Sequence, residues 1–312
     1  MHLALAFGAS GFEKLVAIKT LLPELRGDGA CERLLIEEAR LAARLQHRGL
    51  LQVHDLGVCD AQYFVRLEYI EGADLQALLR MGEPPEPALA LLIAEELAYA
   101  LDYVHRKQDD KGRPLGLVHR DVSPANVLLS TAGEVKLGDF GVAKATHLQD
   151  HTRAGVRKGK YAYMSPEQIS GDDLTGHSDL FSLGVLLAEL LVGRRPFDAE
   201  LGSPPHQTME RIRAAAPADL ACLSTLSIEL GGLLRRCLAR APLERQRSAA
   251  ELGQALGRAR RAYATVGPPE LAAWVNRCLR AQQGSAAPAP LPAMPTMDTA
   301  PYEVIPSKQE PR

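Results

Sequence analysis

The segment 178–193, SDLFSLGVLLAELLVG, is apolar around nearly its whole circumference when it is wound as a helix. A helix at a protein surface keeps polar residues along one side, whereas a helix without such a side must be covered from all directions. This segment therefore predicts a helix in the middle of a large lobe. The chain can build one, because 46% of its 312 residues are hydrophobic, and this length suits one large domain or two medium ones.

Charge and cysteine usage exclude several classes of protein. The net charge is −2, so the overall electrostatic field of the chain does not favour binding to nucleic acid or to an anionic membrane. The five cysteines include no C-x-x-C pair, which argues against a zinc site or a disulfide framework and suits a reducing, cytoplasmic location. Residues 1–20 lack the apolar core of a signal peptide, and no segment is long enough to span a membrane.

The first seventy residues contain short apolar runs separated by turns. Residues 2–6 and 15–19 flank Gly8 and Gly11, a pattern that predicts a β-hairpin. One helix and two further strands are expected after it, at 30–46, near 50–58 and at 63–70.

The pattern from residue 71 onward is mainly helical. Besides the apolar segment, helices are expected at 75–80, 88–106, 226–239 and 248–264, with short strand pieces within 117–144. From about residue 285 the composition shifts to Ala, Pro, Met and polar residues, which predicts a disordered tail.

Two stretches, LVHRDVSPANVLLS and VKLGDFGVAK, hold the side chains with the clearest chemistry. They supply Asp121, Asn126 and Asp139, and the earlier residues Lys19 and Glu38 complete a set suited to phosphoryl transfer. Such a site must position phosphates, neutralise their charge and orient a hydroxyl. Each motif alone has a plain structural interpretation, as a turn, a solvated helix face or a lysine reaching water. Their order and spacing together favour the functional interpretation.

With these motifs in this order, the chain resembles the protein kinase family, specifically the bacterial eukaryotic-like (Hanks-type) Ser/Thr group, over about residues 2–265. The resemblance implies an α+β, two-lobe fold. A small antiparallel-sheet N-lobe with one helix would cover 1–70, a larger and mainly helical C-lobe 71–265, and a C-terminal extension 266–312. It also implies transfer of the γ-phosphate of ATP, with Mg²⁺, to a hydroxyl of an unidentified protein substrate. No nucleic-acid partner is expected, and the oligomeric state stays open.

The same resemblance implies a role for each motif residue. Lys19 would hold the α- and β-phosphates and pair with Glu38. Asp121 would orient the substrate hydroxyl, while Asn126 and Asp139 would hold magnesium. The base and ribose of the nucleotide would be bordered by Ala17, Leu67, Glu68, Ile70, Asp74 and Leu128. Structural or regulatory roles would fall to His119, Arg120, Lys144, Thr152, Lys160, Glu167, Asp179 and Arg245.

Some of these roles can be made specific. His119 would pack and hydrogen-bond within the catalytic loop, and Asp179 would brace that loop. A phosphate on Thr152 would switch the activity by pairing with Arg120 and Lys144.

The chain departs from the family pattern in two places. The usual first strand and G-x-G-x-x-G loop would precede the predicted hairpin, so about thirty residues look absent, and these 312 residues are expected to bind ATP poorly and turn over little. Ser123 and Lys160 stand where a lysine and a threonine are usual. Either the Lys160 ammonium fills the space of the missing lysine, or Lys160 points to solvent and Ser123 makes a local hydrogen bond.

Two other functions fit the same sequence less well. A pseudokinase scaffold would use this fold to bind partners without transferring phosphate. Small-molecule phosphotransferases of related fold lack the Pro-Glu end of the activation segment and its buried arginine partner, which here are Glu167 and Arg245.

Overall fold

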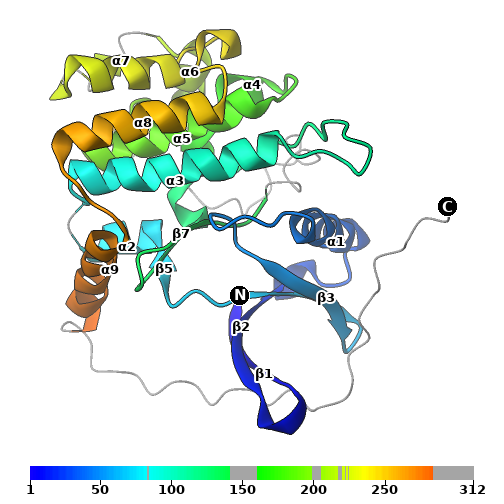
Figure 1. Cartoon of the computed structure of the whole chain (residues 1–312). Coiled ribbons are helices and arrows are strands. Elements are labelled where there is room, and N and C mark those ends of the chain that lie inside the picture. The colour runs from blue at the N-terminus through cyan, green and yellow to red at the C-terminus, as the bar shows by residue number, and fades with distance from the viewer. Residues whose placement is uncertain are drawn as a thin grey trace. The chain divides into compact units, whose positions relative to one another are not determined.

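The computed structural model describes residues 1–82, 84–140, 160–198, 205–216, 220–221, 223 and 225–283. These residues form two compact units (Figure 1). The smaller unit combines 1–46 with 51–70, and the larger unit combines 47–50 with the residues from 71 onward.

The smaller unit is a four-stranded antiparallel sheet with one long helix. The strand order is β1-β2-β4-β3. The elements are β1 (His2–Phe7), β2 (Glu13–Thr20), α1 (Gly29–Ala43), β3 (Val53–Cys59) and β4 (Gln62–Glu68), with short 3₁₀ turns η1 (Ala9–Gly11) and η2 (Pro23–Leu25). The expected hairpin, helix and two strands are thus all present, and the small antiparallel N-lobe sheet is confirmed.

Side-chain alternation along β2 gives the sheet two different faces. Val16 and Ile18 form a buried cluster with Phe64 on one face. Successive side chains of a strand point to opposite faces, so Ala17 and Lys19 lie on the other.

Helix α1 begins where Asp28 caps its first turn. The Asp28 Oδ1 atom accepts from the backbone N–H groups of Ala30 at 2.8 Å and Cys31 at 3.3 Å. A cap of this kind stabilises a helix by about 1 kcal/mol. The helix then packs against β3 and β4 through Leu35, Ala39 and Ala42.

The larger unit is mainly helical, as predicted for the C-lobe. It contains a three-stranded sheet in the order β5-β6-β7, made by β5 (Gly72–Asp74), β6 (Val127–Ser130) and β7 (Val135–Leu137). Its helices are α2 (Leu75–Met81), α3 (Pro87–His105), α4 (Pro166–Ser170), α5 (Gly176–Val192), α6 (Pro205–Ala214), α7 (Ile228–Cys237), α8 (Ala249–Tyr263) and α9 (Pro268–Gln283). Short 3₁₀ turns are η3 (Pro124–Asn126), η5 (Lys160–Tyr163) and η7 (Pro242–Glu244).

Helix α5 is the segment that the apolar pattern places in the middle of a lobe. All of its residues from Ser178 to Ala188 are buried. It is surrounded by α3, α7 and α8, and Figure 1 shows α3, α5 and α8 running side by side. No helix in the described part of the chain is both long and apolar enough to cross a membrane.

Helix α9 was not expected from the sequence, which suggested only an extension after residue 265. It packs against α2 and β6 and buries Leu271, Trp274, Val275 and Cys278. Those four positions follow helical spacing, so a signal was present in the sequence. The elements α4, α6 and β5 were also not predicted. Helix α4 and strand β5 are very short, and α6 buries only Thr208 and Ile212, so each carries little periodic signal.

Candidate functional site

In the smaller unit, Lys19 on β2 is paired with Glu38 on α1. The Lys19 Nζ atom donates to Glu38 Oε1 at 2.8 Å, and the two side chains are 23% and 15% exposed. An ion pair this sheltered from water is screened less than a surface pair. The two groups that the sequence suggests as partners are therefore in contact, and the ammonium is held at a defined place.

The residues expected to border the base lie near the same strand. Ala17 is directly opposite Leu67 in the β2–β4 register, and Leu67 is buried. Glu68 ends β4, and its side-chain Oε1 accepts from the backbone N–H of Gln52 at 2.7 Å. That contact ties the end of β4 to the chain that enters β3, and Ile70 follows half-buried.

In the larger unit, one buried carboxylate holds the H-R-D loop, residues 119–121, in place. Asp179, in the first turn of α5, accepts from the backbone N–H groups of His119 and Arg120, both at 2.8 Å. His105 Nε2 also lies 2.8 Å from Asp179 Oδ2. Arg120 has a φ of +68°, a left-handed conformation that costs a non-glycine residue about 1–2 kcal/mol. Charge-assisted hydrogen bonds from the loop backbone to Asp179 offset that strain.

His119 is a packing residue with a defined tautomer. Its Nδ1 accepts from the backbone N–H of Asp121 at 3.3 Å, because a backbone N–H can only donate. The proton of the neutral ring is therefore on Nε2, which donates to the Gly138 carbonyl at 3.1 Å. Burial lowers the pKa of His119 and outweighs the nearby carboxylates, and the ring packs 4.6 Å from the Phe140 ring. A buried neutral imidazole fits a structural role.

Hydrogen bonds connect Asn126 to the H-R-D stretch before it and to the D-F-G stretch after it. Asn126 Nδ2 donates to the carbonyl of Asp121 at 2.8 Å, and the backbone N–H of Gly138 donates to the carbonyl of Asn126 at 2.9 Å. Asp139 follows Gly138 directly, with a left-handed φ of +49°. Asp121 is buried, whereas Asp139 is half-buried and so more open to a ligand.

The donor atoms at Asn126 and Asp139 suit magnesium. The Asn126 amide nitrogen donates to Asp121, so its Oδ1 is an oxygen acceptor that this hydrogen bond does not use. Asp139 supplies a carboxylate. Among the described residues, no group of three or more His, Cys, Asp and Glu side chains could hold a metal ion. Mg²⁺ is commonly held by one or two protein oxygens together with phosphate and water, so two such ligands fit it.

Asp74 and Leu128, expected near the ribose and base, are directly opposite each other in the β5–β6 register. Asp74 has a further role that the sequence analysis did not assign. Its Oδ1 accepts from the backbone N–H of Ala77 at 2.8 Å and so caps helix α2.

Glu167 and Arg245 form a buried, bidentate ion pair. The Arg245 Nη1 and Nη2 atoms donate to the two carboxylate oxygens of Glu167 at 2.6 and 2.9 Å, and Ser178 Oγ donates to one of them at 2.7 Å. Burial alone would raise the pKa of Glu167, but the hydrogen bonds and charge of Arg245 hold it below its usual range. The pair fixes α4 against α5 and the chain before α8.

Gln168 is a positioning residue that the sequence analysis did not single out. Its Nε2 donates to the carbonyl of Arg120 at 2.9 Å, which ties the start of α4 to the H-R-D loop. Ser165 and Gln168 form a capping box at that helix start, and the S-P-E-Q sequence carries the signal for it.

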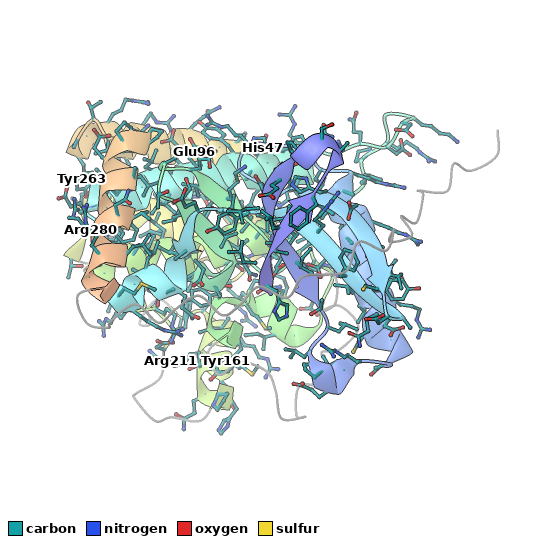
Figure 2. The ribbon with its side chains drawn as sticks, turned by 90° about the horizontal axis from the view of Figure 1, so that it is seen from below. His47, Glu96, Tyr161, Arg211, Tyr263 and Arg280 are labelled. Carbon is teal, nitrogen blue, oxygen red and sulfur yellow. The ribbon has the colours of Figure 1, made fainter. Side chains whose placement is uncertain are left out.

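The chain just before α4 is also held in place. Tyr163, a buried residue, donates a hydrogen bond to Glu189 on α5. Figure 2 shows Tyr161 of η5 and Arg211 of α6 on the same side of the larger unit, in agreement with the contact between η5 and α6.

The remaining expectations have different outcomes. Lys144 and Thr152 lie outside the described residues, and only the backbone of Lys160 is described. Ser123 is 2% exposed, and its Oγ has no hydrogen-bond partner within the described residues. The local hydrogen bond of Ser123, one of the two alternatives given above, is therefore not found in that part of the chain.

Comparison with known proteins gives one family model, described as "Protein kinase domain", which matches residues 9–255. The tyrosine-protein kinase MasK of Myxococcus xanthus is 37% identical, over 82% of this chain and 40% of MasK. The serine/threonine-protein kinase PknH of Mycobacterium tuberculosis is 30% identical, over 93% of this chain and 45% of PknH. The chain thus spans less than half the length of these curated relatives.

Solved structures agree with this match. The crystal structure of the Mycobacterium tuberculosis PknI kinase domain superimposes with a TM-score of 0.56 at 31% sequence identity, covering 82% of this chain and 90% of that one.

Proposed function

Because this chain belongs to the protein kinase domain family, we propose that it transfers the γ-phosphate of ATP to serine or threonine hydroxyls of protein substrates. The observation that carries the proposal is the H-R-D loop held on the buried Asp179. This bracing fixes the backbone that carries Asp121, which in turn accepts from Asn126. A loop held in this way can present a carboxylate to a substrate hydroxyl without reorganisation, which is the main requirement of phosphoryl transfer.

Each residue of the candidate site has a role in this proposal. Asp121 accepts a hydrogen bond from the substrate hydroxyl and orients it. Lys19, positioned by Glu38, binds the α- and β-phosphates. Asn126 and Asp139 hold Mg²⁺, which when bound neutralises charge on the phosphates.

Tyrosine as the acceptor is the second candidate, for a specific reason. The relative with 37% identity is named a tyrosine-protein kinase. The lysine that is usual in Ser/Thr kinases is also replaced by Ser123 in this chain. PknH, PrkC, PknD and PknL, relatives with 30–34% identity, are each named serine/threonine-protein kinases, which supports serine and threonine as the first choice.

A phosphorylation assay with acceptor analysis tests the proposal. Purified chain is incubated with labelled ATP, Mg²⁺ and a mixed peptide pool, and the phosphoamino acids are then separated. We expect phosphoserine and phosphothreonine. In a chain lengthened to include a Gly-rich loop, we expect Asp121→Asn to abolish them while Mg²⁺–ATP still raises the melting temperature. Phosphotyrosine alone would assign the second candidate. Nucleotide binding without any transfer, by a chain lengthened to include a Gly-rich loop, would support a scaffold instead.

We propose further that residues 1–312 alone turn over slowly. Gly8 and Gly11 lie in the turn that leads directly into β2, the strand that carries Lys19. The Gly-rich loop of the family lies one strand earlier, so this turn is not the loop that covers the phosphates. A turnover in the ordinary kinase range of about 1–100 per second would contradict this part of the proposal.

Ser123 and Lys160 provide a separate test of the catalytic loop. The Ser123 hydroxyl is buried without a described partner, which supports a role for a neighbouring cation. If Lys160 supplies it, Lys160→Met lowers turnover in a chain that contains the Gly-rich loop. Unchanged turnover means that Lys160 has no such role.

The proposed switch at Thr152 is tested in the same chain, since Thr152→Ala should remove activation by phosphorylation.

A further inference from the structure

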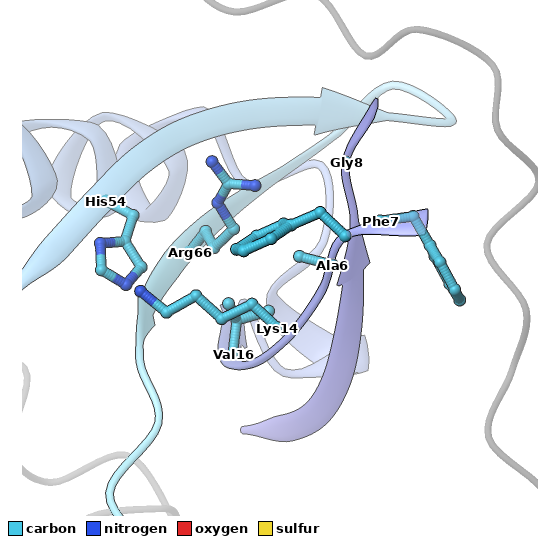
Figure 3. A pocket seen from close by; sticks show the side chains of 8 residues that line it. Ala6, Phe7, Gly8, Lys14, Val16, His54 and Arg66 are labelled. Atoms are coloured by element: carbon cyan, nitrogen blue, oxygen red, sulfur yellow. The ribbon is translucent and has the colours of Figure 1, made fainter. Parts of the chain in front are cut away.

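A pocket of about 430 Å³ lies on the smaller unit beside the β1–β2 hairpin (Figure 3). It combines apolar and basic side chains, and no acidic residue is among those that line it. The lining residues are Ala6, Phe7, Gly8, Phe12, Lys14, Val16, His54 and Arg66. This composition suits a ligand with an apolar body and a negative charge.

The aromatic side of the pocket is fixed by the hairpin turn. The backbone N–H of Gly8 donates to the carbonyl of Phe12 at 2.7 Å, and the Phe12 N–H donates to the carbonyl of Ala9 at 3.1 Å. The Phe12 ring lies so close over Gly8 that a Cβ at Gly8 would come within 2.9 Å of it. Phe7 and Phe12 are nevertheless 60% and 61% exposed, so a ligand that covers them gains apolar burial.

The basic side of the pocket comes from three different strands. Lys14 and Val16 lie on the same face of β2, and Arg66 of β4 faces that side in the strand register. In Figure 3 the Lys14 side chain extends toward the His54 ring. Arg66 is paired with Asp55, whereas the Lys14 side chain makes no salt bridge or hydrogen bond with the described residues.

The electrostatic surroundings of His54 agree with an anion site. Burial, followed by the charges of Lys14 and Arg66, lowers the pKa of His54, and Glu68 and Asp55 offset this only in part. Cations that repel one another around a hollow are stabilised by a bound anion. A phosphate dianion offers several acceptor oxygens and so can contact more than one of them.

We propose that this pocket binds a small phosphate monoester with an aromatic or short aliphatic body. The phosphate contacts Lys14 and His54, and the apolar body lies against Phe7 and Phe12. Lys19 is on the opposite face of β2, so this ligand does not occupy the same place as the phosphates of ATP.

Phenyl phosphate is the probe that we would use, on the whole chain at pH 7, where it is mainly a dianion. The histidines are labelled with ¹³C, and His54 is assigned with the variant His54→Gln. We expect saturable shifts of the His54 resonance and a rise in its pKa. Lys14→Gln should weaken binding by about 3- to 10-fold, the range for losing one partly exposed charge contact. Arg26→Gln, which removes an exposed charge of the same unit outside the pocket, should leave binding unchanged.

Three results would overturn the proposal. The first is no saturable shift of His54 with phenyl phosphate. The second is equal weakening by Lys14→Gln and Arg26→Gln, which would indicate a general charge effect. The third is binding of inorganic phosphate as tight as that of phenyl phosphate, which would leave no role for the aromatic residues. Because Mg²⁺–ATP is expected not to displace the probe, the outcome is independent of whether the chain is a kinase.

Discussion

The buried pair of Glu167 and Arg245 allows a quantitative prediction for the variant Glu167→Gln. Arg245 is 1% exposed, and it also donates to the carbonyls of Ala239, His177 and Arg240. Removing one partner of a buried ion pair costs about 3–5 kcal/mol, because the other charge is left uncompensated. Since three carbonyl acceptors remain, we expect the lower end, about 3 kcal/mol.

The assay uses the single tryptophan of the chain. Trp274 is buried in α9, so its fluorescence reports on unfolding of the larger unit alone. With a urea m-value of about 2–3 kcal/mol/M, the loss corresponds to a midpoint lowered by about 1 M. As a control, Arg106→Gln breaks an exposed i,i+4 pair with Asp102 and should cost less than about 0.5 kcal/mol.

The pH dependence provides an independent check of the same reasoning. Glu167 has a pKa below its usual value in the folded chain, so its ionised form stabilises the fold above the unfolded pKa. That contribution is lost as the pH falls through the folded pKa. The stability difference between wild type and Glu167→Gln should therefore be constant from pH 5 to 8 and shrink below that. A difference under about 1 kcal/mol at pH 7, or one that grows in acid, would refute the argument.

Two further predictions concern the loops of the larger unit. Gly133 has a φ of +84°, and a Cβ there would come within 1.9 Å of the Pro268 carbonyl oxygen, whereas Gly112 has a φ of +75° and open space. Gly112→Ala should therefore cost only the backbone strain of about 1–2 kcal/mol. Gly133→Ala should cost clearly more and alter the tryptophan emission, and equal urea midpoints for the two variants would contradict this. Asp179→Asn should lower kcat at least 10-fold with little change in KM for ATP, because it weakens the bracing of the H-R-D loop. Steady-state kinetics in a chain that contains the Gly-rich loop would show this, and an unchanged kcat would count against it.

The sequence by itself predicted the two-lobe fold, and it supplied the residues that we propose as the reacting groups. The apolar segment 178–193 indicated a central helix, because a helix that is buried on all sides needs apolar residues on all of its faces. Lys19, Asp121, Asn126 and Asp139 stand in short motifs, where the spacing along the chain carries the information. These signals are local, and they can be read without knowing how the chain folds back on itself.

Tertiary structure decided the features that depend on residues distant in sequence. His105 and Asp179 are 74 residues apart in the sequence, and Gln168 and Arg120 are 48 residues apart. No local sequence pattern predicts either contact. The docking of α9, and a Ser123 hydroxyl that is buried without a partner among the described residues, were likewise visible only in the folded chain. The basic pocket is another such case, because its charged side chains come from three strands that only pairing in the sheet brings together. Packing and hydrogen bonding between distant segments are properties of the three-dimensional arrangement, and a linear pattern records them only weakly.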